Sequence, residues 1–301
     1  MPGETVPTFN KRTIPRTGPS KVIFNRNVGP NWFLLRLKEP QIARASAPGQ
    51  FVQIGCSEPG SQDPLLRRPF SVYDVDVEAG TYDILYIVTG RGTRWMASLP
   101  QSGSAADGAD VLVDVIGPFG NRFTPPEPDA VVLLVGGGVG VAPLYFYARE
   151  LCDSAAAKPS QVVLCMGART AEQLQGIDDF RRLPIRCEVA TNDGSEGYDG
   201  FVTGLLESLL NGDLADVQND RVRVYGCGPT GMNEALRRVA VNRSLRCEIC
   251  LESYMACGFG ICFACVAPVA KELDGELYNR RVCLEGPVFD ARLIGPGLGV
   301  L

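Results

Sequence analysis

The hydrophobic pattern of residues 21–117 predicts a series of short β-strands. Apolar runs alternate with Gly, Pro and polar turns, and residues 81–88 partly alternate in polarity, as a half-buried strand does. Six such strands with turn signals between them predict a small antiparallel barrel. The expected strands cover residues 21–24, 32–37, 50–55, 70–75, 81–88 and 109–117.

The pattern changes after residues 117–129, a proline-rich stretch that we interpret as a linker. From Ala130 onward, continuous apolar runs alternate with segments of helical texture, which predicts a parallel sheet covered on both faces. Strands are expected at the start of residues 130–152 and at 161–168, 185–194 and 221–228, with helices at the end of residues 130–152 and at 205–210 and 232–243.

These patterns and the length of 301 residues predict a multidomain chain. The expected parts are an N-terminal arm at 1–20, a β-barrel at 21–125, an α/β domain at 126–243 and a small cysteine-rich domain at 244–301.

Composition and charge exclude several classes of protein. The net charge of −5 disfavours a general affinity for nucleic acid. No apolar run reaches eighteen residues, which argues against a membrane span. Residues 1–20 lack the apolar run of a secretory signal, so we expect a cytoplasmic protein whose eleven cysteines stay reduced.

The chain contains no histidine. Catalysis by a Ser-His-Asp or Cys-His set from this chain alone is therefore excluded. The same absence excludes a zinc site of two cysteines and two histidines, and a Rieske centre. Any four-ligand metal site must be rich in cysteine.

Residues 254–268, "YMACGFGICFACVAP", contain such a cysteine cluster. Cys257, Cys262 and Cys265 are separated by four residues and then two, and Cys283 follows after seventeen more. This spacing is typical of a plant-type [2Fe–2S] site. An alternative is a four-cysteine zinc site made from the pair Cys262 and Cys265 together with the pair Cys247 and Cys250, which otherwise read as ordinary thiols on a strand.

The residues between these cysteines suit a cluster. Gly258 and Gly260 lie in the first gap, where a tight loop must wrap the group. Phe259, Ile261 and Phe263 are apolar and are placed to shield it from water. Phe259 and Phe263 are also candidates for a surface that faces a partner.

Two glycine turns predict a nucleotide site. "GGGVG", residues 136–140, stands between a strand and a helix, where exposed N–H groups attract phosphate. Residues 225–231 repeat that context, and two such turns on one sheet place two loops at the ligand-binding edge. The alternatives are a packing turn without ligand and, for Cys227, a small buried residue.

A chain with both sites needs a two-electron to one-electron converter, because a nicotinamide transfers hydride and a [2Fe–2S] cluster accepts single electrons. Flavin performs this conversion. The barrel offers Arg68 and Ser71, and then Gly92 and Thr93, for flavin phosphate and hydrogen-bond contacts. The alternative for Arg68 is a solvated turn.

Together, these motifs resemble the ferredoxin–NADP reductase superfamily. "RPFS" is similar to its flavin motif, and "GGGVGVAP" and "YGCGP" are similar to its nicotinamide motifs. The cysteine segment resembles the electron-transfer subunits of class B dihydroorotate dehydrogenases, over roughly residues 20–291.

The resemblance implies FAD, one [2Fe–2S] cluster and NAD as substrate. It implies pairing, as a heterotetramer, with an FMN-containing catalytic subunit that oxidises dihydroorotate to orotate in pyrimidine biosynthesis. Electrons would pass from FMN through the cluster and FAD to NAD+. The chain would thus be a flavin and iron–sulfur oxidoreductase subunit.

The resemblance also assigns residues. The flavin residues would be Arg68, Pro69, Phe70, Ser71, Leu85, Tyr86, Ile87, Gly92 and Thr93. The nicotinamide residues would be Gly136, Gly137, Gly138, Gly140, Gly228 and Pro229, with Cys227 catalytic. The cluster ligands would be Cys257, Cys262, Cys265 and Cys283.

The sequence departs from this pattern at Ile87, where family members often have a basic residue. One phosphate contact is then missing or comes from elsewhere, with Arg91 and Arg94 as candidates. Related chains also serve as NAD(P)H–FAD diaphorase subunits of sulfide dehydrogenases, bifurcating transhydrogenases and hydrogenases, which is the alternative function. A zinc-stabilised binding module without redox activity is a third.

Overall fold

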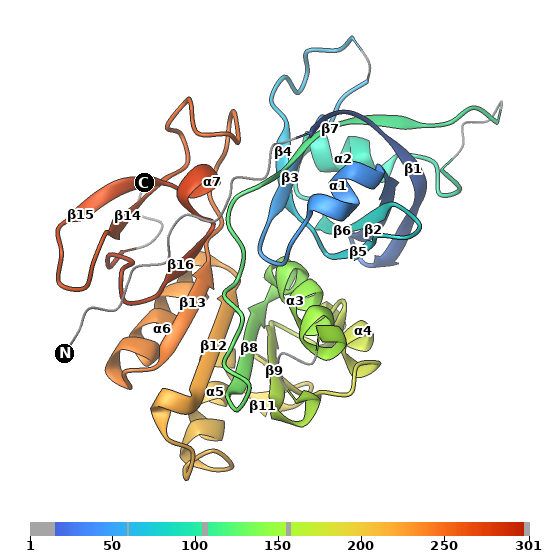
Figure 1. The fold of residues 1–301 in the computed structure, drawn as a ribbon. Coiled ribbons are helices and arrows are strands. Elements are labelled where there is room, and N and C mark those ends of the chain that lie inside the picture. Colours follow the sequence, from blue (N-terminus) through green and yellow to red (C-terminus); the bar gives the residue numbers. More distant parts are fainter. Residues whose placement is uncertain (1–15, 59, 104–107, 155–157, 298–301) are drawn as a thin grey trace.

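The computed structural model describes residues 16–58, 60–103, 108–154 and 158–297. It contains a β-barrel, an α/β unit and a C-terminal cysteine-rich segment, which lies beside the barrel and above the α/β sheet (Figure 1). The predicted multidomain fold is confirmed. Residues 1–15 of the predicted arm lie outside the described residues. No described helix is both long and apolar enough to cross a membrane.

The N-terminal part folds into an antiparallel barrel. Among the described residues, its sheet has seven strands in the order β4-β3-β7-β1-β2-β6-β5. The rings of Phe70 and Tyr86 meet edge to face across β4 and β6, with centroids 6.0 Å apart. The strands are β1 (Arg16–Gly29), β2 (Trp32–Lys38), β3 (Phe51–Ile54), β4 (Arg68–Ser71), β5 (Asp74–Asp76), β6 (Thr81–Ile87) and β7 (Leu112–Phe119), and the helices are α1 (Pro40–Ala45) and α2 (Arg91–Ala97).

The barrel differs from the prediction in three places. The expected strand 70–75 is divided between β4 and β5, because the backbone changes partners there: the N–H of Val72 donates to Gln50 beside β3, and the N–H of Tyr73 donates to Asp83 on β6. Residues 16–20, expected in the arm, pair with β7. Residues 117–119, expected in the linker, are the end of β7.

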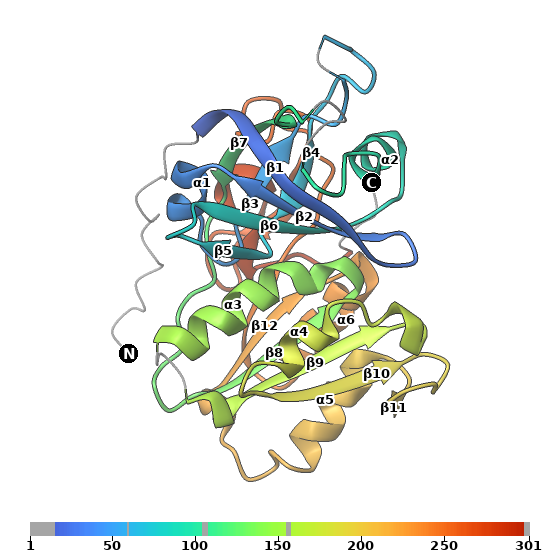
Figure 2. The same cartoon turned by 90° about the vertical axis from the view of Figure 1, so that its right-hand side faces the viewer.

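The second unit is a sheet with helices on both faces. In the described part of the chain, its strand order is β11-β10-β9-β8-β12-β13-β16, parallel except for β16. Helices α3 and α4 cover one face and α5 and α6 the other (Figure 2). The strands are β8 (Val131–Gly137), β9 (Val162–Ala168), β10 (Arg186–Thr191), β11 (Tyr198–Asp199), β12 (Val222–Cys227), β13 (Arg246–Cys250) and β16 (Val288–Asp290). The helices are α3 (Val141–Ser154), α4 (Ile177–Arg181), α5 (Val202–Asn211) and α6 (Thr230–Asn242), with short 3₁₀ helices η1 (Gly138–Gly140), η2 (Pro159–Gln161), η3 (Ala171–Gln173) and η4 (Asn219–Arg221).

The cysteine-rich segment leaves this sheet and returns to it. Strand β13 leads into the segment, and β16 comes back to pair antiparallel with β13. Between them lie β14 (Val266–Ala270), β15 (Leu277–Arg281) and α7 (Val282–Glu285). The domain limit expected at residues 243 and 244 therefore falls inside the sheet, just before its strand β13.

The barrel is joined to the α/β unit by a partly buried polar contact. Arg149 on α3 donates to both carboxylate oxygens of Asp74 on β5, at 2.8 and 2.6 Å. Beside this pair, the Tyr73 hydroxyl donates to Asp179 at 2.6 Å, and the Tyr73 ring stacks on Tyr145 with centroids 4.5 Å apart. These contacts fix α3 against the barrel.

We predict that Arg149→Met destabilises the protein by about 1–2 kcal/mol, because a partly buried carboxylate loses both charged hydrogen bonds and keeps the N–H of Val75. Burial already raises the pKa of Asp74, and Arg149 opposes this rise. The measurement is the midpoint of thermal unfolding. Arg238→Met on α6 is the control, since Arg238 is exposed and Glu234 keeps a second partner in Arg237. Equal losses in both variants would contradict the prediction.

Candidate functional site

The cysteine loop, residues 251–265, connects β13 to β14 and packs on the outer face of the barrel. Gly258 has a φ of +79°, a left-handed conformation that favours glycine. A β-carbon there would lie 2.4 Å from Nε2 of Gln53, so the available space also requires glycine. The ring of Phe259 stacks on Phe119 with centroids 6.3 Å apart. The loop is thus seated on strands β3 and β7.

The four predicted cluster ligands form two pairs. The Cys257 side chain interacts with that of Cys262, and the Cys265 side chain interacts with that of Cys283. The backbone N–H of Cys283, in α7, also donates to Cys265 Sγ at 3.5 Å. The fold therefore brings the distant fourth cysteine to the loop, as the spacing predicts.

This arrangement fits a two-iron cluster, in which each iron takes two thiolates. Among the described residues, no three or more Cys, Asp, Glu or His side chains are placed to hold a single metal ion. A structural zinc site requires four ligands around one point. The pairing agrees with a [2Fe–2S] cluster, and the four cysteines remain its predicted ligands.

Hydrogen bonds prepare two of these cysteines as thiolates. Burial opposes ionisation of Cys257, but backbone N–H groups of Cys262 and Phe259 stabilise its thiolate and lower its pKa to about 7. Interaction with the Cys283 side chain lowers the pKa of Cys265 to about 6. The same interaction raises the pKa of Cys283. Since the thiolate is the metal-binding form, part of the ligand set is already suited to iron.

The alternative zinc set is not brought together. Cys247 and Cys250 lie on β13 and are buried. Cys250 is the register partner of Cys227 on β12, rather than a neighbour of Cys262 and Cys265 in the loop. Burial raises the pKa of Cys247 well above its ordinary value. Both residues are thiols on a strand that leads into the loop.

The two glycine turns meet at the carboxyl edge of the parallel sheet. One turn follows β8 and passes through η1 into α3, and the other follows β12 and leads into α6. Strands β8 and β12 are neighbours, and the chain order reverses between them. Open parallel sheets bind ligands at such a switch point.

Direct contact joins these turns. A β-carbon on Gly140 would lie 2.5 Å from both the carbonyl oxygen of Cys227 and the Cα of Gly228. The Met232 side chain covers both turns, since it would lie within 2.7 Å of a β-carbon on Gly137 or Gly228. The predicted nicotinamide residues thus gather in one place, and their contact with NAD stays a prediction. They are Gly136, Gly137, Gly138, Gly140, Gly228 and Pro229.

The Cys227 thiol is buried, in contrast to an exposed catalytic group. Its side chain interacts with that of Cys250, and this interaction together with burial raises its pKa well above the ordinary value. A thiolate at Cys227 is therefore disfavoured. What Cys227 presents to the glycine turn is its backbone carbonyl, and its catalytic role stays a prediction.

The flavin motif lies on β4, beside the start of α2. A β-carbon on Gly92 would lie 2.9 Å from Cys56 Cβ and 3.7 Å from Arg68 Cγ, so the two predicted flavin segments are adjacent. Arg68 donates to the carbonyl oxygen of Leu66 at 2.7 Å. The hydroxyl of Thr93 accepts from the N–H groups of Thr89 and Gly90, at 2.9 and 3.1 Å, and is engaged within the turn.

The remaining predicted flavin residues are less available. The side chains of Leu85 and Tyr86 are buried in the protein, and the Tyr86 hydroxyl donates to Asn25 at 3.1 Å. A cofactor can therefore meet these two residues only through their backbone. Ile87 is partly buried. Arg91 and Arg94 are the candidates for the phosphate contact that a basic residue at position 87 would make. Arg91 is paired with Asp63.

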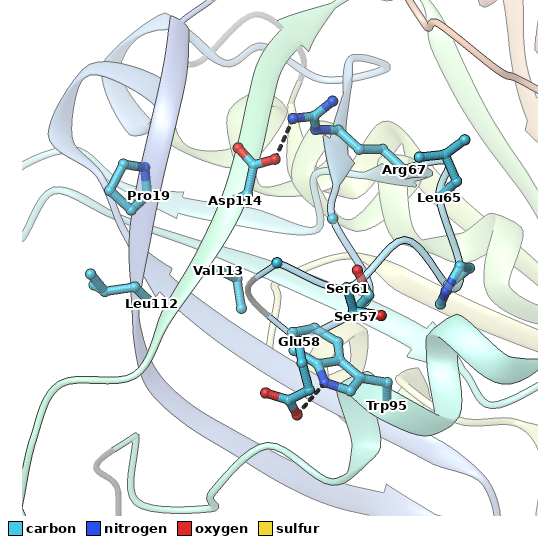
Figure 3. A pocket seen from close by; sticks show the side chains of 13 residues that line it. Pro19, Ser57, Glu58, Ser61, Leu65, Arg67, Trp95, Leu112, Val113 and Asp114 are labelled. Carbon is cyan, nitrogen blue, oxygen red and sulfur yellow. Dashed lines mark hydrogen bonds and ion pairs between the residues drawn. The ribbon is translucent and has the colours of Figure 1, made fainter.

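A pocket of about 400 Å³ opens next to the flavin motif (Figure 3). On one wall Trp95 Nε1 donates to Glu58 at 2.7 Å, and on another Arg67 pairs with Asp114. None of the predicted flavin residues lines it, although Arg67 immediately precedes Arg68. Sequence reasoning missed this pocket, because its walls come from β1, the β3–β4 loop, α2 and β7.

Glu252 was also missed. Its side chain is exposed, yet the surrounding protein desolvates the carboxylate and raises its pKa. Its charge also acts on Cys227, which places it near the glycine turns. The available signal was an acidic residue just beyond a buried strand at the ligand-binding edge of the sheet.

The geometry defines a class of protein: a flavin-type barrel, a nucleotide-type sheet and a paired-cysteine centre together describe an NAD-linked reductase with an iron–sulfur domain. Family models match two of these parts. The oxidoreductase NAD-binding domain matches residues 134–238, and the iron–sulfur cluster binding domain of dihydroorotate dehydrogenase B matches residues 252–295. The second match includes all four predicted ligands and excludes Cys247 and Cys250.

Curated relatives are similar over nearly their full length. The chain is 33% identical over 270 residues to the dihydroorotate dehydrogenase B (NAD(+)) electron transfer subunit of Desulforamulus reducens, covering 90% of this chain and 95% of that one. It is 36% identical over 271 residues to the subunit of the same description from Bacillus cereus, covering 89% and 94%. The chain therefore belongs to the family of dihydroorotate dehydrogenase B electron transfer subunits.

Solved structures agree on the fold. An NADH-dependent reduced ferredoxin–NADP oxidoreductase, described in a study of electron bifurcation, aligns with a TM-score of 0.76 at 28% identity, over 93% of this chain and 91% of that chain. A ferredoxin NADP+ reductase from Neisseria gonorrhoeae aligns with a TM-score of 0.60 at 17% identity, over 75% and 91%, and shows the fold alone. The expected iron–sulfur and NAD-binding domains are confirmed, and the reductase fold supports FAD as the third group.

We predict that Gly140→Ala raises the KM for NADH at least about tenfold, since the new methyl group meets the backbone of the second turn and cannot rotate away. The measurement is NADH-dependent reduction of an artificial acceptor such as ferricyanide. Gly231→Ala is the matched control, because a β-carbon at Gly231 would meet nothing within 4 Å. If both variants have the KM of the parent protein, the contact between the turns does not shape the NADH site.

Proposed function

We propose that this chain is the electron-transfer subunit of a dihydroorotate dehydrogenase, which passes electrons from the FMN of a catalytic subunit to NAD+. The observation that carries the proposal is the seating of the paired cysteines on the barrel. Strand β3 pairs with the flavin-motif strand β4 on one side, and its outer face holds the cysteine loop. The proposed cluster and FAD sites thus share one structural element.

In this proposal each part of the chain has a distinct task. Bound FAD would convert between the hydride chemistry of NAD and the single electrons of the cluster. Arg68 to Ser71 and the start of α2 would hold the flavin, and the two glycine turns would place NAD at the sheet edge. Cys257, Cys262, Cys265 and Cys283 would hold the cluster at the far end of the relay.

The partner would meet the exposed apolar side of the cysteine loop. Tyr254, Ile261 and Phe263 are 96%, 73% and 57% exposed, and Phe259 is 43% exposed. Cys262, a proposed ligand, is exposed among them. Large apolar side chains gathered around an exposed ligand favour a docking surface where electrons enter. We propose that the catalytic subunit binds here, in a heterotetramer of two subunits of each kind.

A second candidate keeps the cofactors and changes the partner. The similarity to the NADH-dependent reduced ferredoxin–NADP oxidoreductase, at a TM-score of 0.76 over 93% of this chain, favours a diaphorase subunit of a bifurcating complex. The cysteine segment and both nucleotide turns suit either function. The full-length relatives favour the first.

Co-expression with the catalytic subunit from the same organism tests the proposal. We expect a stable complex that reduces NAD+ when dihydroorotate is supplied, because the cysteine loop offers the entry point for electrons. The measurement is formation of NADH at 340 nm by the purified complex.

The catalytic subunit alone and this chain alone are the controls, and neither should reduce NAD+ with dihydroorotate. Failure to form a complex would count against the proposal. Assembly instead with a large subunit of the bifurcating type would support the second candidate.

We further predict that Cys262→Ser abolishes electron transfer to the partner but preserves reduction of FAD by NADH, because the cluster lies beyond FAD in the relay. The two readouts are dihydroorotate-dependent NAD+ reduction and NADH-dependent bleaching of flavin absorbance. Cys152→Ser, on α3, is the cysteine control and should preserve both. Loss of FAD reduction in a Cys262 variant that folds and retains FAD would contradict the proposed order.

A further inference from the structure

Gln53 on β3 is a buried polar residue whose amide is poorly matched to its surroundings. Its side chain is fully buried, and its Oε1 atom has no hydrogen-bond partner. Its Nε2 atom donates to the thioether sulfur of Met255 at 3.8 Å, and a thioether is a weak acceptor. An amide buried in this way costs free energy and therefore requires an explanation.

The contrast with Gln50 shows that the mismatch is specific. Gln50 is also buried, just before β3. Its Oε1 atom accepts from the N–H of Ala47 at 2.9 Å, and its Nε2 atom donates to the carbonyl oxygen of Gly120 at 2.8 Å. The same region of the barrel thus satisfies one glutamine on both sides and leaves the other nearly without partners.

Gln53 lies between the flavin motif and the cysteine loop. In the register of β3 and β4 it is opposite Pro69 of the motif. Val52 and Ile54 belong to the barrel interior, so strand alternation directs Gln53 outward. There its Nε2, Cγ and Cδ atoms would lie 2.4, 2.6 and 2.8 Å from a β-carbon on Gly258, next to the ligand Cys257.

A primary amide has two N–H donors, and thiolate or sulfide sulfur accepts hydrogen bonds better than a thioether because it carries charge. We propose that Gln53 donates to the sulfur atoms held by the cysteine loop and thereby tunes the potential of the iron–sulfur site. This inference rests on the proposed function only in requiring that the loop holds a cluster. Donors stabilise the reduced and more negative state, so Gln53 raises the potential.

The test replaces Gln53 by methionine, which has a similar volume and no N–H donor. We expect the midpoint potential of Gln53→Met, from a redox titration followed by electron paramagnetic resonance, to become more negative. For a one-electron group, a shift of about 59 mV in the midpoint potential changes the ratio of reduced to oxidised cluster tenfold at a given solution potential. Gln50→Met is the matched control. It removes a buried amide of the same size and should leave the potential unchanged, whatever it does to stability.

If the Gln53→Met variant does not take up the cluster, a measurement on the wild-type protein tests whether Gln53 donates to the cluster. With side-chain ¹⁵N-labelled glutamine, pulsed electron paramagnetic resonance of the reduced cluster should detect a weak ¹⁵N coupling, which Gln50→Met retains. A cluster without that coupling, or a loaded Gln53→Met protein with the parent potential, overturns the inference. A wild-type protein without an iron–sulfur signal would instead contradict the proposed function.

Discussion

The packing of the cysteine loop on the outer face of the barrel is the constraint on which the rest of the structure depends. Electron transfer between bound groups falls steeply with distance, so the cysteines must be held close to the flavin side. The rings of Phe51, Phe119 and Phe259 form a continuous apolar contact between β3, β7 and the loop. Because β3 also pairs with β4, displacement of this strand would alter both proposed cofactor sites together.

The absence of histidine agrees with this type of chemistry. Passing single electrons along a relay requires held cofactors and fixed distances more than a proton donor tuned to neutral pH. Partly buried polar groups also join parts of the chain. The contacts of Tyr73 with Asp179 and of Arg149 with Asp74 connect the barrel to α3 and α4, next to the sheet edge proposed for NAD.

Features set by local chemistry could be predicted from the sequence. The spacing of the cysteines predicts which thiols lie in one loop. An apolar strand followed by glycines predicts the position of a turn. Features set by distant contacts could not be predicted. Residues 16–20 contain Gly and Pro and read as an arm, yet they form the start of β1 because β7 supplies partners. Strand β16, with only three residues, gains its place from β13. Gln53 carries no local signal, since its contacts come from the cysteine loop, about two hundred residues further along the chain.

The return of the chain at β16 has a consequence for how the cysteine-rich segment can be removed or exchanged. Its two ends are held together, since the N–H of Leu251 donates to the carbonyl oxygen of Pro287 at 2.9 Å. The segment therefore begins and ends at adjacent points of one sheet, so replacing it would leave both attachment points in place. A chain simply cut after β13 would instead lose β16 as well. Strand β13 would then become an unprotected sheet edge, which is a template for aggregation.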